Sequence, residues 1–149
     1  MAGLSRHQNR TTEVAIMKNA DVSLQTKQVN VDYDVIAPDG SEIRLLTQVN
    51  GGGMCHCTLP LGEISKPVVH STVEEIWYFI SGQGQVWRKF GDFEEIIEAL
   101  PGCSVNIPLG ASFQFRNLGD DPLCFIIVTI PQWPGEQEVK DVPGPWRLE

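Results

Sequence analysis

The 149-residue sequence has few positive charges, no long hydrophobic segment and few histidines. Its 11 lysines and arginines stand against 19 aspartates and glutamates, which gives a formal net charge of -8 at pH 7. Proteins that bind nucleic acid or an anionic membrane surface need a basic patch, so we expect neither partner. The longest apolar run, Leu123 to Val128, is far shorter than the roughly 18 residues that cross a bilayer. Residues 1–18 contain no apolar stretch of the kind that directs secretion, so we expect a soluble protein.

Cysteines are also few, and all of them lie inside apolar runs: Cys55, Cys57, Cys103 and Cys124. This placement favours buried thiols in a reducing cytoplasm over a disulfide framework. The Cys55-His56-Cys57 triplet resembles a metal-binding motif, but zinc sites usually separate their cysteines by two to four residues. On a β-strand the two cysteines share one face and His56 takes the other. We therefore interpret them as core thiols.

The rest of the chain consists of short β-prone runs separated by glycine, proline, asparagine and aspartate, without sustained helical periodicity. The turn Pro38-Asp39-Gly40 predicts a first hairpin between residues 33–37 and 42–47. Regular spacing of the later runs predicts a single all-β domain, a sandwich or closed barrel. The further predicted strands cover residues 54–59, 76–81, 85–89, 94–99, 103–107, 113–117 and 123–130.

A spaced motif lies in the second half of the chain. Gly102, Pro108, Gly110 and Asn117 occur at the intervals of the pattern G-x5-P-x-G-x2-H-x3-N, and Phe113 stands at the histidine position. This pattern resembles the second motif of the cupin superfamily. Residues at intervals of two project from one face of a strand, so position 113 is expected to face inward.

The first cupin motif, G-x5-H-x-H-x(3,4)-E-x6-G, is matched less fully. Glu75 precedes Gly82 by the required interval. Counting back from Glu75 places His70 at the second histidine, Val68 at the first and Gly62 at the opening glycine. A second alignment makes His70 the first histidine and Thr72 the second, and it loses the match at Gly62. Both alignments keep one imidazole and one carboxylate.

The odd interval between His70 and Glu75 would send the two side chains to opposite faces of a regular strand. We therefore expect a bulge or turn between Ser71 and Glu74. Without it, Glu74 would replace Glu75 as the inward carboxylate.

The resemblance implies a cupin-type jelly-roll β-barrel, also called a double-stranded β-helix, of two facing antiparallel sheets with a central pocket. It divides the chain into an extension over residues 1–50 that packs on the barrel or swaps with a partner, a core barrel over 51–131 and a proline-rich tail over 132–149. We expect the tail to be irregular and to pack through Trp133 and Trp146. Since cupin dimers often exchange such segments, we expect a homodimer.

Family members hold a divalent metal on three histidines and a glutamate, or bind sugars or small acids without metal. This sequence has three histidines in all, and the strongest metal constellation is His56, His70 and Glu75, which could hold Fe, Mn or Zn. Phe113 argues against metal because it replaces a donor with apolar surface. The favoured prediction is therefore no cofactor.

Two function hypotheses follow. The first is a cupin that binds a small organic acid or sugar derivative, with His70 and Glu75 available as an acid/base pair. Its pocket wall would include Trp77, Phe79, Arg88, Phe113 and Phe115, although these aromatic residues could equally fill a packed core. The second is a metal-dependent dioxygenase, isomerase or lyase that uses His56, His70 and Glu75.

Overall fold

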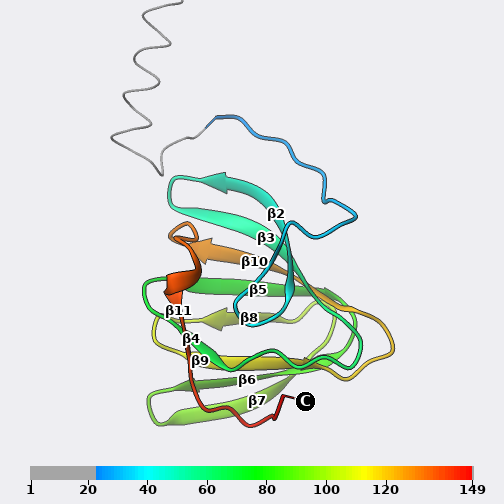
Figure 1. Cartoon of the computed structure of the whole chain (residues 1–149), viewed down its shortest axis with the longest axis vertical. Coiled ribbons are helices and arrows are strands. Elements are labelled where there is room, and N and C mark those ends of the chain that lie inside the picture. Colours follow the sequence, from blue (N-terminus) through cyan, green and yellow to red (C-terminus); the bar gives the residue numbers. More distant parts are fainter. Residues whose placement is uncertain (1–22, 149) are drawn as a thin grey trace, which may run out of the picture.

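Two antiparallel sheets face each other across a shared interior in the computed structural model, which describes residues 23–148 (Figure 1). The six-stranded sheet has the order β1 (Val35–Ile36), β2 (Glu42–Val49), β3 (Gly52–Leu59), β10 (Leu123–Ile130), β5 (Glu74–Ser81) and β8 (Ser104–Ile107). The five-stranded sheet has the order β11 (Val139–Asp141), β4 (Val68–His70), β9 (Ser112–Asn117), β6 (Gly84–Phe90) and β7 (Phe93–Ala99). The all-β jelly-roll prediction is confirmed. None of the described residues forms a helix long and apolar enough to cross a membrane.

The interior is aromatic. Trp77 and Phe79 of β5, Phe125 of β10, and Phe113 and Phe115 of β9 are all at most 2% exposed. Their rings meet at short distances, for example 4.6 Å between Phe79 and Phe125 and 5.2 Å between Trp77 and Phe113. Such ring pairs contribute about 0.5–1.5 kcal/mol each beyond the burial of their surface. The aromatic cluster therefore joins the two sheets.

The chain crosses from one sheet to the other between His70 and Glu75. β4 ends at His70 in the five-stranded sheet, and β5 begins at Glu74 in the six-stranded sheet, with a bend at Ser71 and Thr72. Both side chains therefore face the interior despite their odd interval. Glu75 is 6% exposed while Glu74 is exposed, so Glu75 is the inward carboxylate.

The sequence missed two short strands. β4 has only three residues and follows Pro67, so it is too short to show the alternation of apolar and polar residues that marks a strand. β11 lies in the tail that was expected to be irregular, and it pairs with β4 through Val139 opposite His70. The predicted first hairpin forms, but its first strand shortens to Val35–Ile36.

The tail packs beyond β11 on the outer face of the five-stranded sheet. The Gln114 side chain donates to the backbone oxygen of Trp146 at 2.8 Å and accepts from its backbone N–H at 3.1 Å. The Arg116 guanidinium lies 4.3 Å from the centre of the Trp146 ring. Gln114 is thus a structural anchor on the side of the sheet away from the interior.

Candidate functional site

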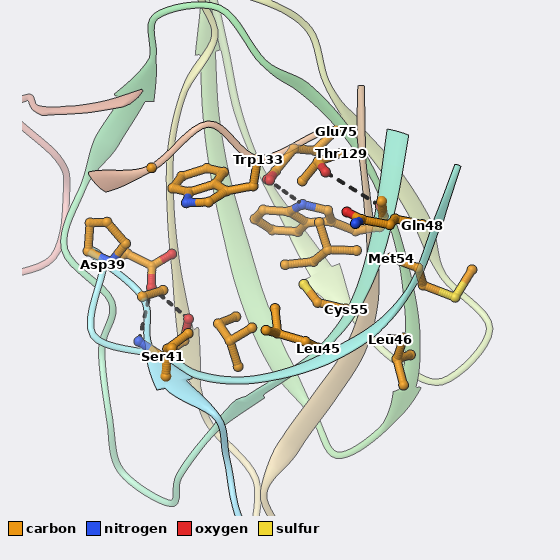
Figure 2. Close-up of a pocket in the computed structure, with 18 of the residues that line it drawn as sticks. Asp39, Ser41, Leu45, Leu46, Gln48, Met54, Cys55, Glu75, Thr129 and Trp133 are labelled. Atoms are coloured by element: carbon orange, nitrogen blue, oxygen red, sulfur yellow. Dashed lines mark hydrogen bonds between the residues drawn. The ribbon is translucent and has the colours of Figure 1, made fainter. Parts of the chain in front are cut away.

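A cavity of about 860 Å³ lies between the sheets among the described residues. Its walls come from residues 24–27, the β1–β2 hairpin, the strands β2, β3, β4, β5, β9 and β10, and the connection that precedes β11. Leu45 and Trp133 at its edge are 47% and 40% exposed, so the cavity reaches solvent. Figure 2 shows this wall with Asp39, Cys55, Glu75 and Trp133 among its labelled side chains.

His70 is the most unusual group in this wall. It is 5% exposed, and neither of its ring nitrogens has a hydrogen-bond partner within residues 23–148. Its ring stacks on Phe113 at 5.3 Å and meets Trp133 edge-on at 5.4 Å. Leaving a buried polar atom unsatisfied costs about 1–3 kcal/mol, so such an atom beside a cavity marks a place for a ligand.

Glu75 lies next to His70. Its Oε1 is 3.4 Å from His70 Nε2, outside hydrogen-bond geometry, and accepts the Trp77 indole N–H at 3.0 Å. The Trp77 indole fixes the carboxylate, while the aromatic rings of Trp77 and Phe113 shield the pair from one side. One imidazole and one carboxylate therefore lie within 3.4 Å of each other beside the cavity.

Glu138 supports the site from the tail. Its carboxylate accepts the backbone N–H groups of Thr72 and Val73 at 2.5 and 2.6 Å and the Thr72 hydroxyl at 2.6 Å, and it lies 3.9 Å from His70 Nδ1. Burial opposes the charge on this carboxylate, but these hydrogen bonds and the nearby imidazole outweigh it and lower the pKa of Glu138. Glu138 therefore fixes the crossing between the sheets. Glu138 lies far from either motif, so no sequence pattern indicates its role.

Asp39 is a second carboxylate that sequence reasoning missed. It accepts the backbone N–H and hydroxyl of Ser41 at 2.9 and 2.6 Å and lines the cavity. Burial raises the pKa of Asp39 despite these hydrogen bonds, and the charge of Glu75 adds to the rise. The Pro38-Asp39-Gly40 sequence predicts a turn. In the structure Asp39 both stabilises that turn and lines the cavity. Sequence alone therefore could not separate the two roles.

Cys55 also lines the cavity, on the inward face of β3. Burial, together with the charges of Glu75 and Asp39, raises the pKa of its thiol to about 12. The thiol is therefore protonated at neutral pH and is not a nucleophile.

The four positions of the cupin metal motifs meet at this cavity. Val68, His70, Glu75 and Phe113 all line it, and Val68 lies directly opposite Phe113 across β4 and β9. This supports the alignment that begins at Gly62. Thr72, the other candidate for a histidine position, instead bonds Glu138.

His56 does not join His70 and Glu75. It alternates with Cys55 and Cys57 on β3 and pairs in register with Arg44 of β2 and Ile126 of β10, on the face away from the cavity. Partial burial and the Arg44 charge lower the pKa of His56. The three predicted metal ligands therefore do not converge, because strand alternation separates them.

The donor set at the cavity does not fit a cupin metal. Two of the four motif positions carry hydrocarbon side chains, and across residues 23–148 no group of three or more His, Cys, Asp or Glu side chains is arranged to hold an ion. One imidazole and one carboxylate leave most of the coordination shell of Fe, Mn or Zn unfilled.

The remaining predicted wall residues divide into three kinds. Trp77 and Phe113 line the cavity, whereas Phe79 and Phe115 pack within the aromatic cluster. Arg88 lies in register with Phe113 but bonds the backbone and side-chain oxygens of Asn106 at 2.8 and 2.9 Å and Glu95 at 2.5 Å. It bridges β6, β7 and β8 and does not reach the cavity wall. Trp133, which does, was expected only as a packing residue.

Comparison with known proteins identifies the family. Residues 55–129 match the model of the cupin domain, and the chain belongs to this family. An uncharacterized protein of Methanocaldococcus jannaschii is 28% identical over 119 residues, which cover 74% of this chain and 92% of that protein.

Solved structures share the fold. An uncharacterized protein with a double-stranded beta-helix domain from Klebsiella pneumoniae superposes with a TM-score of 0.63 at 16% identity, over 82% of this chain and 100% of that chain. Recombinant oxalate oxidase gives 0.63 at 20% identity, over 80% of this chain and 65% of that one. The capsular polysaccharide assembling protein CapF of Staphylococcus aureus gives 0.60 at 21% identity, over 80% of this chain and 35% of CapF. The chain thus spans about a third of CapF. These low identities establish the fold alone.

Proposed function

We propose that this cupin binds a small organic molecule in the cavity between its sheets, without the full cupin metal site. The observation that carries the proposal is His70, which is buried beside a cavity of about 860 Å³ and has no hydrogen-bond partner at either ring nitrogen within residues 23–148. Ligand pockets commonly have volumes of about 300–1,000 Å³, apolar walls and a few convergent polar groups. The cavity has this composition, since Trp77, Phe113 and Trp133 surround His70, Glu75 and Asp39.

We further propose that His70 and Glu75 serve as an acid/base pair when the ligand is a substrate. At 3.4 Å the two groups can share or relay a proton through small movements. Trp77 holds Glu75 by its indole N–H, and Glu138 holds the backbone that follows His70. The reactive pair is therefore supported on both sides by hydrogen-bonded neighbours.

The metal-dependent alternative, with His56, His70 and Glu75 as ligands, has less support because His56 lies on the other face of β3. We propose no metal cofactor. Metal analysis after chelation and reconstitution checks this, and stoichiometric metal that is lost in His70→Ala would overturn it.

Thermal-shift and calorimetric binding to a panel of organic acids, sugars and amines tests the proposed function. Ile127 lines the cavity, whereas Ile126 beside it on β10 points to the outer face, so Ile127→Phe and Ile126→Phe are a matched pair. We expect at least one ligand class to bind the wild type and the Ile126→Phe variant, and to be lost from Ile127→Phe. Failure of every class to bind, or equal loss in both variants, would contradict the proposal.

We also propose a homodimer in the cytoplasm. Support for the dimer comes from exposed apolar side chains at the β1–β2 edge of the larger sheet, where Val35, Ile36 and Leu45 are 47–48% exposed. Size-exclusion chromatography with light scattering tests it, and a monomer at micromolar concentration would refute it.

A further inference from the structure

The charge of the cavity wall restricts what the proposed binding site can hold. Asp39, Glu75 and Glu136 line the cavity, and the described wall residues that can carry positive charge are Lys27 and His70. Even with His70 protonated, the acids in this wall outnumber the bases by three to two. Glu138, which is not itself a lining residue, adds a further carboxylate 3.9 Å from the imidazole, so carboxylates outnumber bases around the cavity.

An anionic ligand would therefore enter an unfavourable field. Arg88, which the sequence predicts as a residue of the pocket wall, is held by Asn106 and Glu95 instead. Burial is the main cause of the raised pKa of Cys55, and the charges of Glu75 and Asp39 on the same wall add to it. Charge complementarity thus disfavours the organic acid that the sequence suggested.

From this arrangement we infer that the cavity binds a small organic cation, an ammonium group carried on a compact apolar body. This inference rests on the proposed binding function and names its ligand class. Three aromatic residues line the same wall as the carboxylates, namely Trp77, Phe113 and Trp133.

The aromatic faces complete the recognition of a cation. Aromatic rings attract ammonium groups through their negative faces, most strongly where water is excluded. Phe113 stacks on the His70 ring at 5.3 Å and Trp133 meets it edge-on at 5.4 Å, so both aromatic rings lie against the imidazole. In the view of Figure 2 the Trp133 ring lies between Asp39 and Glu75. The carboxylates and the aromatic rings thus line the same cavity.

Three ligands of the same shape and different charge test the inference: choline, its neutral isostere 3,3-dimethylbutan-1-ol, and the anion 3,3-dimethylbutanoate. Dissociation constants are measured by calorimetry on the full chain. We expect choline to bind at least about tenfold more tightly than the alcohol, and the anion to bind most weakly. The result that overturns the inference is an alcohol or anion that binds as tightly as choline, or no detectable binding of choline at millimolar concentration.

Variants of the acidic residues test which carboxylate contributes to cation binding. Asp39→Asn and Glu75→Gln should each weaken choline binding about tenfold and lower the preference for choline over the alcohol by a similar factor, with circular dichroism to show that each variant is folded. Glu74→Gln is the matched control, since it removes the neighbouring carboxylate that is exposed outside the cavity. Equal loss in Glu74→Gln and Glu75→Gln would overturn the inference. If another ligand class binds in the cavity while choline does not, the inference fails and the proposed binding function stands.

Discussion

Val68 and Phe113 lie directly opposite each other on the neighbouring strands β4 and β9, and both side chains line the cavity. They occupy the first and last histidine positions of the cupin motifs. Residues paired in this way have Cβ atoms about 4.5–5.5 Å apart, close enough for two imidazoles to share one ion. A hydrocarbon pair thus fills the place of two metal ligands, while His70 and Glu75 keep the other two positions.

The double variant Val68→His/Phe113→His should therefore gain a metal site. With His70 and Glu75 it supplies three imidazoles and a carboxylate, and we expect about one equivalent of Mn, Fe, Co or Zn after reconstitution, with much less in either single variant. Elemental analysis measures the metal. Val69→His/Ser112→His is the control, because the adjacent pair in register faces the other way. Equal metal in both double variants would contradict the proposed correspondence of positions.

Glu138→Gln should destabilise the fold by about 1–3 kcal/mol, because the neutral amide replaces a carboxylate that accepts the N–H groups of Thr72 and Val73. Urea unfolding measures the loss. Glu136→Gln, two residues away, should change the free energy of unfolding by less than about 0.5 kcal/mol.

The same carboxylate predicts a pH dependence. The pKa of Glu138 in the folded protein lies below its ordinary value of 4.5, so its contribution is present above pH 4.5 and is lost as the pH falls through the folded pKa. We expect the free energy of unfolding to fall more steeply with acid in the wild type than in Glu138→Gln. Parallel curves for the two proteins would contradict the role given to Glu138.

Cys55 should resist alkylation although it lines the cavity. With a pKa of about 12, its thiolate fraction at pH 7.5 is smaller than that of an ordinary thiol by roughly three orders of magnitude. We expect iodoacetamide to label Cys55 slower by about that factor in the folded chain than in urea, as peptide mass spectrometry would show. Labelling at equal rates would contradict the raised pKa assigned to the Cys55 thiol.

The sequence predicted the parts of this structure that are local or fixed by spacing. β10 was predicted with the bounds Leu123–Ile130, since a run of alternating and apolar residues ends at a proline. The interval from Gly102 to Asn117 placed Phe113 inward, and the turn expected after His70 brings Glu75 beside it.

The rest of the site depends on segments that meet only in the folded chain. Asp39 comes from a hairpin turn, and Trp133 and Glu138 from a tail whose prolines suggested no regular structure. Their contacts with residues of the barrel span about 30 to 70 positions, and no local pattern encodes such distances. His56 shows the opposite case, a residue that the sequence suggested and the fold excludes. It lies shortly before the first motif, which suggested a metal ligand, but strand alternation directs it away from the cavity.

The central claim is that His70 marks an organic ligand site, and a crystal structure grown with the tightest ligand of the panel tests it most directly. We expect the ligand to lie between the sheets, with a polar atom within about 3.2 Å of a His70 ring nitrogen and with apolar contacts to Phe113 and Trp133. A ligand bound outside this cavity, or a metal ion held by His70 and Glu75 in its place, would show that His70 does not mark an organic ligand site.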